Sequence, residues 1–99
     1  MDSEKDFYVY MLANKMGGTI YIGVTSDLVG RTYIHRENLV PGFTSKYGLH
    51  RLVWFEQQGD AEYAILREKQ LKKWNRAWKI RLIEEKNPAW VDLYPTLFT

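Results

Sequence analysis

The sequence predicts an α+β fold, with a small three-stranded, mostly antiparallel sheet flanked by helices. Segments rich in aromatic and β-branched residues alternate with segments whose apolar residues recur at helical spacing. Their order along the chain is strand, strand, helix, strand, helix, helix. The 99 residues have the length of one domain, so we expect a single domain spanning residues 1–99.

The three strands are expected at residues 7–13, 19–25 and 51–57, where apolar and β-branched side chains dominate. Residues 14–18, with the sequence Asn-Lys-Met-Gly-Gly, form a turn between the first two strands. Because this connection is short, the first two strands are expected to pair as an antiparallel hairpin.

Tyrosines gather on one side of this predicted hairpin. Tyr8 and Tyr10 share a face of the first strand, and Tyr21 shares a face of the second strand with Gly23. We expect Tyr8 and Tyr10 to lie opposite Tyr21, as an aromatic pair that either only packs or lines a site. A glycine within a strand leaves room for a ligand or for another part of the chain.

The remaining residues predict three helices, one loop and an apolar tail. The first helix is capped by Ser26 or Asp27 and stopped by Pro41-Gly42, and residues 43–49 follow as a loop. The later helices cover about residues 61–74 and 77–86, and the tail at residues 89–99 packs back on the body.

Composition excludes several classes of protein. There is no cysteine, so the chain has no disulfide, thiolate zinc site or cysteine nucleophile. The first six residues lack the apolar core of a signal peptide, and no apolar run reaches the ~20 residues that span a bilayer. We therefore expect a cytoplasmic protein without a membrane partner, whose oligomeric state the sequence does not indicate.

Positive charge is concentrated in one part of the chain. Residues 67–86 hold eight basic and three acidic residues, a net charge of +5, whereas the whole chain carries only +2. Such a stripe is either a solvated helical face or a surface that attracts a polyanion. Six of its eight basic residues are Lys69, Lys72, Lys73, Arg76, Lys79 and Arg81.

Glu68 interrupts an apolar stripe on the helix predicted from residue 61. The stripe consists of Ala61, Ala64, Ile65, Leu71, Trp74 and Trp78. A carboxylate in this position is paired, protonated or bound to a metal, because burying it alone is costly. A salt bridge to a neighbouring lysine or arginine is the simpler alternative.

Arg31 and His35 form a similar anomaly on the first predicted helix. Their spacing of four places them on one helix face, which they share with Leu28 and Leu39. A cation and an imidazole on a core-facing stripe indicate an anion site, although a snorkelling arginine and a surface histidine explain the same pattern.

The ordered combination of these residues resembles the GIY-YIG nuclease superfamily. Tyr8-Val9-Tyr10 is a variant of the first motif, Tyr21-Ile22-Gly23 matches the second literally, and Arg31, His35 and Glu68 follow in order. Residues 42–48, with the sequence Gly-Phe-Thr-Ser-Lys-Tyr-Gly, look like the small standalone bacterial members. The resemblance covers residues 7 to about 93.

The resemblance implies a metal-dependent endonuclease that hydrolyses phosphodiester bonds in DNA or structured nucleic acid, with DNA favoured over RNA. It implies that Glu68 is the sole protein ligand of a Mg²⁺ or Mn²⁺ ion and that Arg31 holds the scissile phosphate. Tyr10 and Tyr21 would line the site, and His35 would assist proton transfer. Asn87 would correspond to a supporting polar residue.

The residue types suit this chemistry. Mg²⁺ keeps most of its waters, so one carboxylate ligand is sufficient, and the planar fork of arginine matches a phosphate. In a site of this kind either Tyr21 or His35 would be the base that accepts the proton of the attacking water, and the sequence does not decide between them. Lys69, Lys72, Lys73, Arg76 and Lys79 would contact the flanking phosphates.

Two functions of other classes stay open. The first is a nucleic-acid-binding module without catalysis, bound through residues 67–86 with steep salt dependence. The second is a protein-interaction domain that uses exposed indoles of Trp74, Trp78 or Trp90, which requires these indoles to be accessible.

Overall fold

Three antiparallel strands form the centre of the computed structural model, which describes residues 6–39 and 41–98. Strand β1 (Phe7–Ala13) lies in the middle, between β2 (Ile20–Thr25) and β3 (Arg51–Gln58). The bounds agree closely with the three predicted strands. The observed arrangement confirms the α+β class and the antiparallel hairpin.

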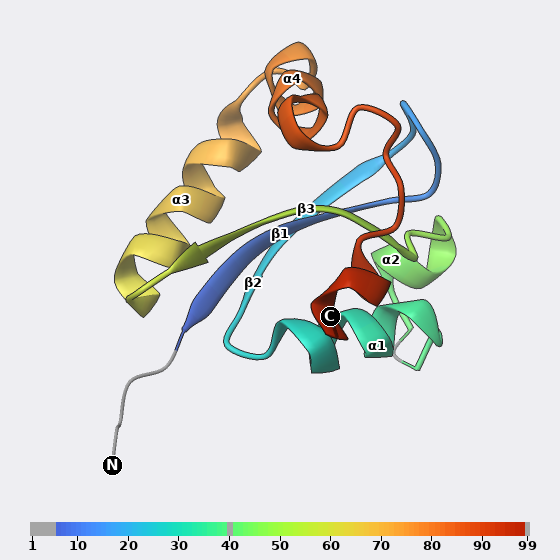
Figure 1. Cartoon of the computed structure of the whole chain (residues 1–99), viewed down its shortest axis with the longest axis horizontal. Coiled ribbons are helices and arrows are strands. Elements are labelled where there is room, and N and C mark those ends of the chain that lie inside the picture. The colour runs from blue at the N-terminus through green and yellow to red at the C-terminus, as the bar shows by residue number, and fades with distance from the viewer. Residues whose placement is uncertain (1–5, 40, 99) are drawn as a thin grey trace.

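Helices cover both faces of this sheet, as Figure 1 shows. One face packs against α3 (Ala61–Lys73) and α4 (Arg76–Lys86), and the other faces α1 (Leu28–Arg36), α2 (Phe43–Lys46) and a terminal 3₁₀ helix, η1 (Tyr94–Phe98). Strand alternation explains the two cores, because successive side chains of β1 point to opposite faces.

The two cores differ in composition. On the α3 and α4 face the buried residues are Val9, Met11, Ala13, Ile22, Val53, Trp54, Ala64, Leu71, Ile83 and Trp90. On the other face they are Tyr10, Leu12, Leu28, Leu49 and Leu52, with Tyr8 and Tyr21 partly buried against them. The tyrosines of the hairpin therefore belong to the face covered by α1 and α2.

Helix α1 begins where the sequence predicts and ends earlier. Its N-cap is Asp27, whose side chain accepts a hydrogen bond from the Gly30 amide at 3.0 Å. A side chain at Gly30 would collide with that carboxylate, since a Cβ there would lie 2.2 Å from an Asp27 oxygen. The helix ends at Arg36 and not at Pro41, because Asn38 adopts a left-handed φ of 55° that helix geometry does not allow.

The predicted loop at residues 43–49 is wrong in part, because Phe43–Lys46 form the short helix α2. Gly42 and Gly48 bound this turn with φ values of 143° and 66°, which favour glycine. A helix of four residues is too short to produce a recognisable periodicity in the sequence.

The continuous apolar stripe predicted across residues 61–78 is also wrong in part. Ala64 and Leu71 are buried, but Ala61, Ile65 and Trp78 are exposed. The chain turns at Trp74 into extended backbone, and Asn75 caps a new helix by accepting a hydrogen bond from the Trp78 amide. The periodicity of α3 therefore does not continue into α4.

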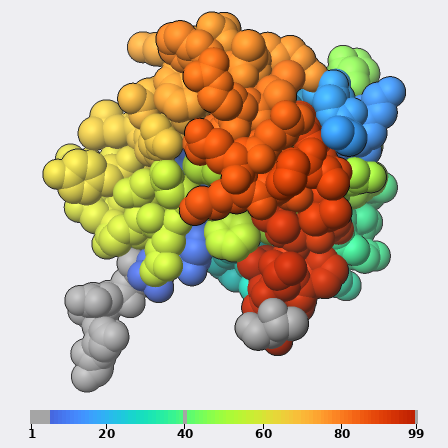
Figure 2. Space-filling model, turned by 45° about the horizontal axis from the view of Figure 1, so that its top comes forward, coloured from blue at the N-terminus to red at the C-terminus, as the bar shows by residue number. Residues whose placement is uncertain are grey.

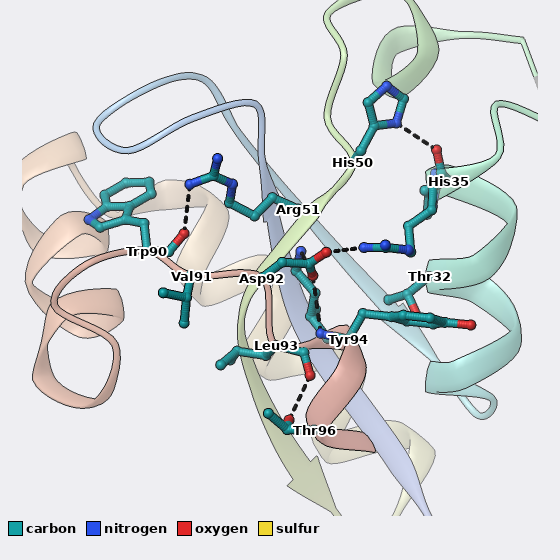
Figure 3. Close-up of polar contacts among 12 residues, drawn as sticks. Thr32, His35, His50, Arg51, Trp90, Val91, Asp92, Leu93, Tyr94 and Thr96 are labelled. Atoms are coloured by element: carbon teal, nitrogen blue, oxygen red, sulfur yellow. Dashed lines mark hydrogen bonds and ion pairs between the residues drawn. The ribbon is translucent and has the colours of Figure 1, made fainter. Parts of the chain in front are cut away.

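The C-terminal segment packs back on the body, as predicted. Figure 2 shows it lying across the surface below α4. Leu93 and Leu97 pack on the tyrosine-bearing core, and the Leu93 amide donates to the Leu52 carbonyl at 2.7 Å. In Figure 3, the Arg51 side chain of β3 donates to the Trp90 carbonyl. Asp92 pairs with Arg36 of α1, so this segment joins β3 to α1.

Among the described residues, no helix combines the length and the apolar character needed to cross a membrane.

Candidate active site

The site begins at the hairpin, where Tyr10 lies opposite Gly23 and not opposite Tyr21 as predicted. Tyr21 instead pairs with Leu12, which lies two residues after Tyr10 on the same face of β1. A Cβ at Gly23 would lie 2.5 Å from the Tyr10 hydroxyl oxygen and 2.6 Å from ring carbon Cζ. The space that this glycine provides is therefore filled by the Tyr10 ring and not by a ligand.

Tyr10, Tyr21 and His35 form a cluster of three rings. The ring centroids of Tyr10 and Tyr21 are 6.3 Å apart, those of Tyr10 and His35 are 6.3 Å apart, and those of Tyr21 and His35 are 5.9 Å apart. Tyr10 is almost fully buried, whereas Tyr21 and His35 are half-buried. The predicted meeting of the hairpin tyrosines with His35 of α1 is present in the structure.

His35 is held at both ring nitrogens. Its Nε2 lies 3.5 Å from the Tyr10 hydroxyl, and its Nδ1 lies 3.0 Å from the hydroxyl of Thr44 on α2. His50 contacts the backbone of the same residue, with its Nδ1 2.9 Å from the His35 carbonyl oxygen (Figure 3). These contacts fix the orientation of the imidazole relative to the Tyr10 hydroxyl.

Burial and neighbouring charges set the protonation of this cluster. The pKa of Tyr10 is raised above its usual value, chiefly by burial and then by Tyr21, which also forms a side-chain hydrogen bond with it. The pKa of His35 is lowered chiefly by burial, then by the charge of Arg31 and by the neighbouring His50. At neutral pH the structure therefore holds a protonated phenol next to a neutral imidazole.

Arg31 lies on α1 at the edge of this cluster. The prediction that it shares a core-facing stripe with Leu28 and Leu39 is wrong, because Leu28 and Thr32 are buried whereas Arg31 and Leu39 are exposed. Its charge nevertheless lowers the pKa of Tyr10 and that of His35. Arg31 is therefore a solvent-accessible cation within electrostatic range of both groups.

Glu68 approaches the cluster from α3. It lies between the buried Ala64 and Leu71, and only 16% of its side chain is exposed. Its charge raises the pKa of Tyr10. Its carboxylate Oε2 pairs with Lys72 Nζ at 3.1 Å, so the simpler alternative, a salt bridge one turn away, is present.

The partner of Glu68 is a surface lysine, 53% exposed, and not a buried cation. Such an i,i+4 pair contributes only ~0.3–0.5 kcal/mol, because water solvates the ammonium group and the lysine side chain is flexible. The salt bridge is therefore weak enough for the Glu68 carboxylate to exchange Lys72 for another cation.

The predicted basic stripe divides into exposed and structural residues. Lys69, Lys72 and Lys73 are exposed on α3. Arg76 donates to the carbonyls of Gly17 and Gly18 at 2.6 and 2.7 Å, and thereby ties α4 to the hairpin turn. Lys79 is half-buried.

Asn87, which the resemblance implies is a supporting polar residue, lies at the C-terminal end of α4 against β3. It is buried, donates to the carbonyls of Val53 and Val91, and accepts from the Val91 amide. The register of β3 shifts at Val53, and Asn87 satisfies its carbonyl there. Asn87 thus fastens the end of α4 to β3.

The three indoles considered for protein binding do not form one surface. Trp90 is fully buried and donates through Nε1 to Glu84 at 2.7 Å. Trp74 is half-buried and packs edge-on against Trp78, which is 48% exposed. This weakens the interpretation of the chain as a protein-interaction domain.

Sequence reasoning missed the contribution of α2. Thr44 contacts His35, and Phe43 packs near Tyr21 with ring centroids 6.2 Å apart. Gly42 and Gly48, which bound the segment, are the signal of a turn in the sequence, because four residues are too few to show a helical periodicity.

Comparison with known proteins agrees with this geometry. Residues 6–81 match the family described as the GIY-YIG catalytic domain, and this range includes all five predicted site residues. The chain belongs to the GIY-YIG family.

A solved structure supports the same assignment for the fold. The UPF0213 protein BH0048 from Bacillus halodurans, determined by solution NMR, is 29% identical in sequence and superposes with a TM-score of 0.52. The alignment covers 83% of this chain and 86% of that protein. No curated protein matches the GIY-YIG chain described here.

Proposed function

We propose that this GIY-YIG protein is a metal-dependent endonuclease that hydrolyses phosphodiester bonds in nucleic acid, with DNA favoured over RNA. The observation that carries the proposal is the environment of Tyr10. Its buried hydroxyl contacts Tyr21 and His35. The charges of Arg31 and Glu68 act on its pKa in opposite directions, because Arg31 lowers it and Glu68 raises it. Family membership supports the same reaction class.

Each of these groups has a role suited to its position. Arg31 is exposed and permanently charged, so its guanidinium can bind a phosphate that arrives from solvent. Tyr10 keeps its proton and donates a hydrogen bond, because its raised pKa excludes it as a base at neutral pH. Tyr21 lies beside both Tyr10 and His35 and positions the attacking water.

His35 is the better candidate for the proton acceptor. Its lowered pKa keeps it neutral at neutral pH, and a neutral imidazole has one nitrogen free to accept a proton. If Nδ1 carries the ring proton and donates to the Thr44 hydroxyl, the lone pair of Nε2 faces the Tyr10 side of the site.

The donor set around Glu68 fits a magnesium ion held by one carboxylate. The described residues contain no group of three histidine, cysteine or acidic side chains that would form a complete metal cage. Mg²⁺ is commonly bound by one or two carboxylates, with water and substrate phosphate as the other ligands. Bound there, the ion would supply charge neutralisation and a more acidic water.

A cleavage assay tests this proposal. Purified protein is incubated with duplex, branched and single-stranded DNA and with RNA, each with Mg²⁺, Mn²⁺ or EDTA. We expect cleavage only with metal, and its loss in Glu68→Gln. Glu62→Gln, on an exposed glutamate of the same helix, is the matched control and should cleave like the wild type.

A second candidate function is a nucleic-acid-binding module without catalysis. The exposed cations Lys69, Lys72 and Lys73 on one helix favour it. Binding without cleavage of any substrate, unchanged by EDTA and by Glu68→Gln, would support this alternative and contradict the endonuclease.

A further inference from the structure

Two aromatic side chains are exposed beside the candidate active site, one on α2 and one on the residue that caps its C-terminal end. Phe43 is 49% exposed and Tyr47 is 45% exposed, and their ring centroids are 4.7 Å apart. We refer to these two residues as the α2 aromatic pair. Neither of them has a place in the chemistry proposed above.

The α2 aromatic pair is anchored from beneath. Thr44, between the two rings in sequence, is buried, and its hydroxyl lies 3.0 Å from His35 Nδ1. Its carbonyl accepts a hydrogen bond from the Leu49 amide at 2.8 Å, and Leu49 is fully buried. The inward residues of α2 are therefore tied to the core, which leaves the two rings as its outward surface.

The pair continues the row of rings that starts in the site. Tyr10 and Tyr21 have centroids 6.3 Å apart, Tyr21 and Phe43 6.2 Å, and Phe43 and Tyr47 4.7 Å. Exposure rises from the buried Tyr10 through the half-buried Tyr21 to Phe43 and Tyr47, which are about equally exposed. A nucleic-acid strand with one phosphate in the candidate active site would therefore have the exposed rings of Phe43 and Tyr47 next to it.

Charge at the pair suits a nucleotide. The ammonium of Lys46 lies 5.5 Å from the centroid of the Tyr47 ring, so a cation accompanies the exposed rings. Proteins that bind single strands combine basic groups, which contact the backbone, with aromatic rings on which bases stack. A purely apolar partner would offer no anionic group for the ammonium of Lys46 to contact.

We propose that Phe43 and Tyr47 form a stacking subsite for an unpaired nucleobase adjacent to the scissile phosphate, with Lys46 contacting the backbone. The inference rests on the proposed function for the position of that phosphate. It implies that the substrate presents an unstacked base, as in a single strand, a flap or a distorted duplex. A base inside an undistorted duplex has no exposed face for these rings.

Binding measured in EDTA tests the subsite without cleavage. Fluorescence anisotropy compares an oligothymidylate with an abasic chain of the same length, which carries the same phosphates but no bases. We expect the wild type to bind the thymidylate at least about fivefold more tightly than the abasic chain. In Phe43→Ala/Tyr47→Ala this preference should vanish while the affinity for the abasic chain stays the same.

Two further proteins control for folding and for general loss of aromatic surface. Phe43→Leu/Tyr47→Leu keeps apolar bulk on α2 but offers no flat ring, so it should also lose the preference if the fold is intact by circular dichroism. Tyr63→Ala removes an exposed tyrosine of α3, which is 66% exposed, and should keep the preference.

The outcomes separate this inference from the proposed function. Equal binding of both oligonucleotides by the wild type, or an unchanged preference in both double variants, overturns the subsite even if the protein cleaves nucleic acid. A preference that depends on the two rings supports the subsite even if no cleavage is found.

Discussion

Gly23 and Tyr10 face each other across the hairpin, and their contact leaves no room for a side chain at residue 23. A Cβ there would meet the Tyr10 hydroxyl and ring at 2.5–2.6 Å. Tyr10 is buried and adjoins the other site groups, so it has little freedom to retreat. The glycine that ends the Tyr-Ile-Gly motif thus leaves room for the side chain of a tyrosine on the neighbouring strand.

Gly23→Ala is therefore expected to destabilise the fold by about 1–3 kcal/mol, the usual cost of overpacking, and to displace Tyr10. Urea denaturation measures the change. Gly59→Ala is the matched control, because a Cβ at Gly59 meets nothing within 4 Å. Equal free energies of unfolding for the two variants would contradict the contact.

Thr44 is expected to position His35 without touching substrate. Thr44→Val removes the hydroxyl at Nδ1 and should reduce kcat by about 10-fold, which is a part of the roughly 10²–10⁴-fold that a positioned base contributes. KM should change little, and Thr44→Ser should restore activity. Steady-state kinetics measure this split, and a Thr44→Val protein with wild-type kcat would refute the role.

His35 also makes the stability of the fold depend on pH. Its folded pKa is lowered from the reference value of 6.5, so the unfolded chain binds a proton that the folded chain does not. This contribution to stability is present above pH 6.5 and is lost as the pH falls through the lowered folded value.

When the pH is lowered from neutral to about 5, the urea midpoint should therefore decrease more in the wild type than in His35→Gln. The groups other than His35 are present in both proteins, so the difference between the two decreases reports chiefly on His35. An equal decrease in both proteins would show that His35 has the same pKa folded and unfolded.

At the scale of single residues, sequence reasoning identified side chains but not their contacts. Tyr10, Tyr21 and His35 do meet, but the register that places Tyr10 opposite Gly23 depends on the length of the turn. The exposure of Arg31 and the surface salt bridge of Glu68 depend on how α1 and α3 are rotated against the sheet. The spacing of residues along a single helix does not predict how that helix is rotated against the sheet.

At the scale of elements, strands and long helices were predictable because their patterns extend over several residues. Strands β1 and β3 match their predicted bounds within a residue. The four-residue helix α2 and the early end of α1 depend on backbone conformations at Gly42, Asn38 and Gly48 that periodicity does not register. The missed helix carries Thr44 and the α2 aromatic pair, so the error concealed part of the candidate site.

The buried side-chain amide of Asn87 holds the start of the C-terminal segment against β3. Asn87→Ala would leave the carbonyls of Val53 and Val91 without their donor, and we expect a loss of about 1–3 kcal/mol in the free energy of unfolding. Thermal or urea unfolding measures it, with Gln57→Ala, an exposed amide of β3, as control. A loss no larger than that of the control would show that Asn87 is not a structural tie.

At the scale of the whole molecule, the sheet and its two helical layers bring together groups that are distant in the sequence. Tyr10 and Tyr21 come from the hairpin, Arg31 and His35 from α1, and Glu68 from α3. The packing of α1 and α3 on opposite faces allows a cation and a carboxylate to act on one phenol. The order of these residues indicated the family, but only the fold accounts for their proximity.

The proposed function is tested most directly by the single-turnover rate of nucleic-acid cleavage in Mg²⁺, compared among the wild type, Arg31→Ala and Glu68→Gln. We expect metal-dependent cleavage by the wild type and losses of about 100-fold or more in each variant, since both charges act on the transition state. Cleavage by either variant at the wild-type rate, or none by the wild type on any substrate, would contradict it.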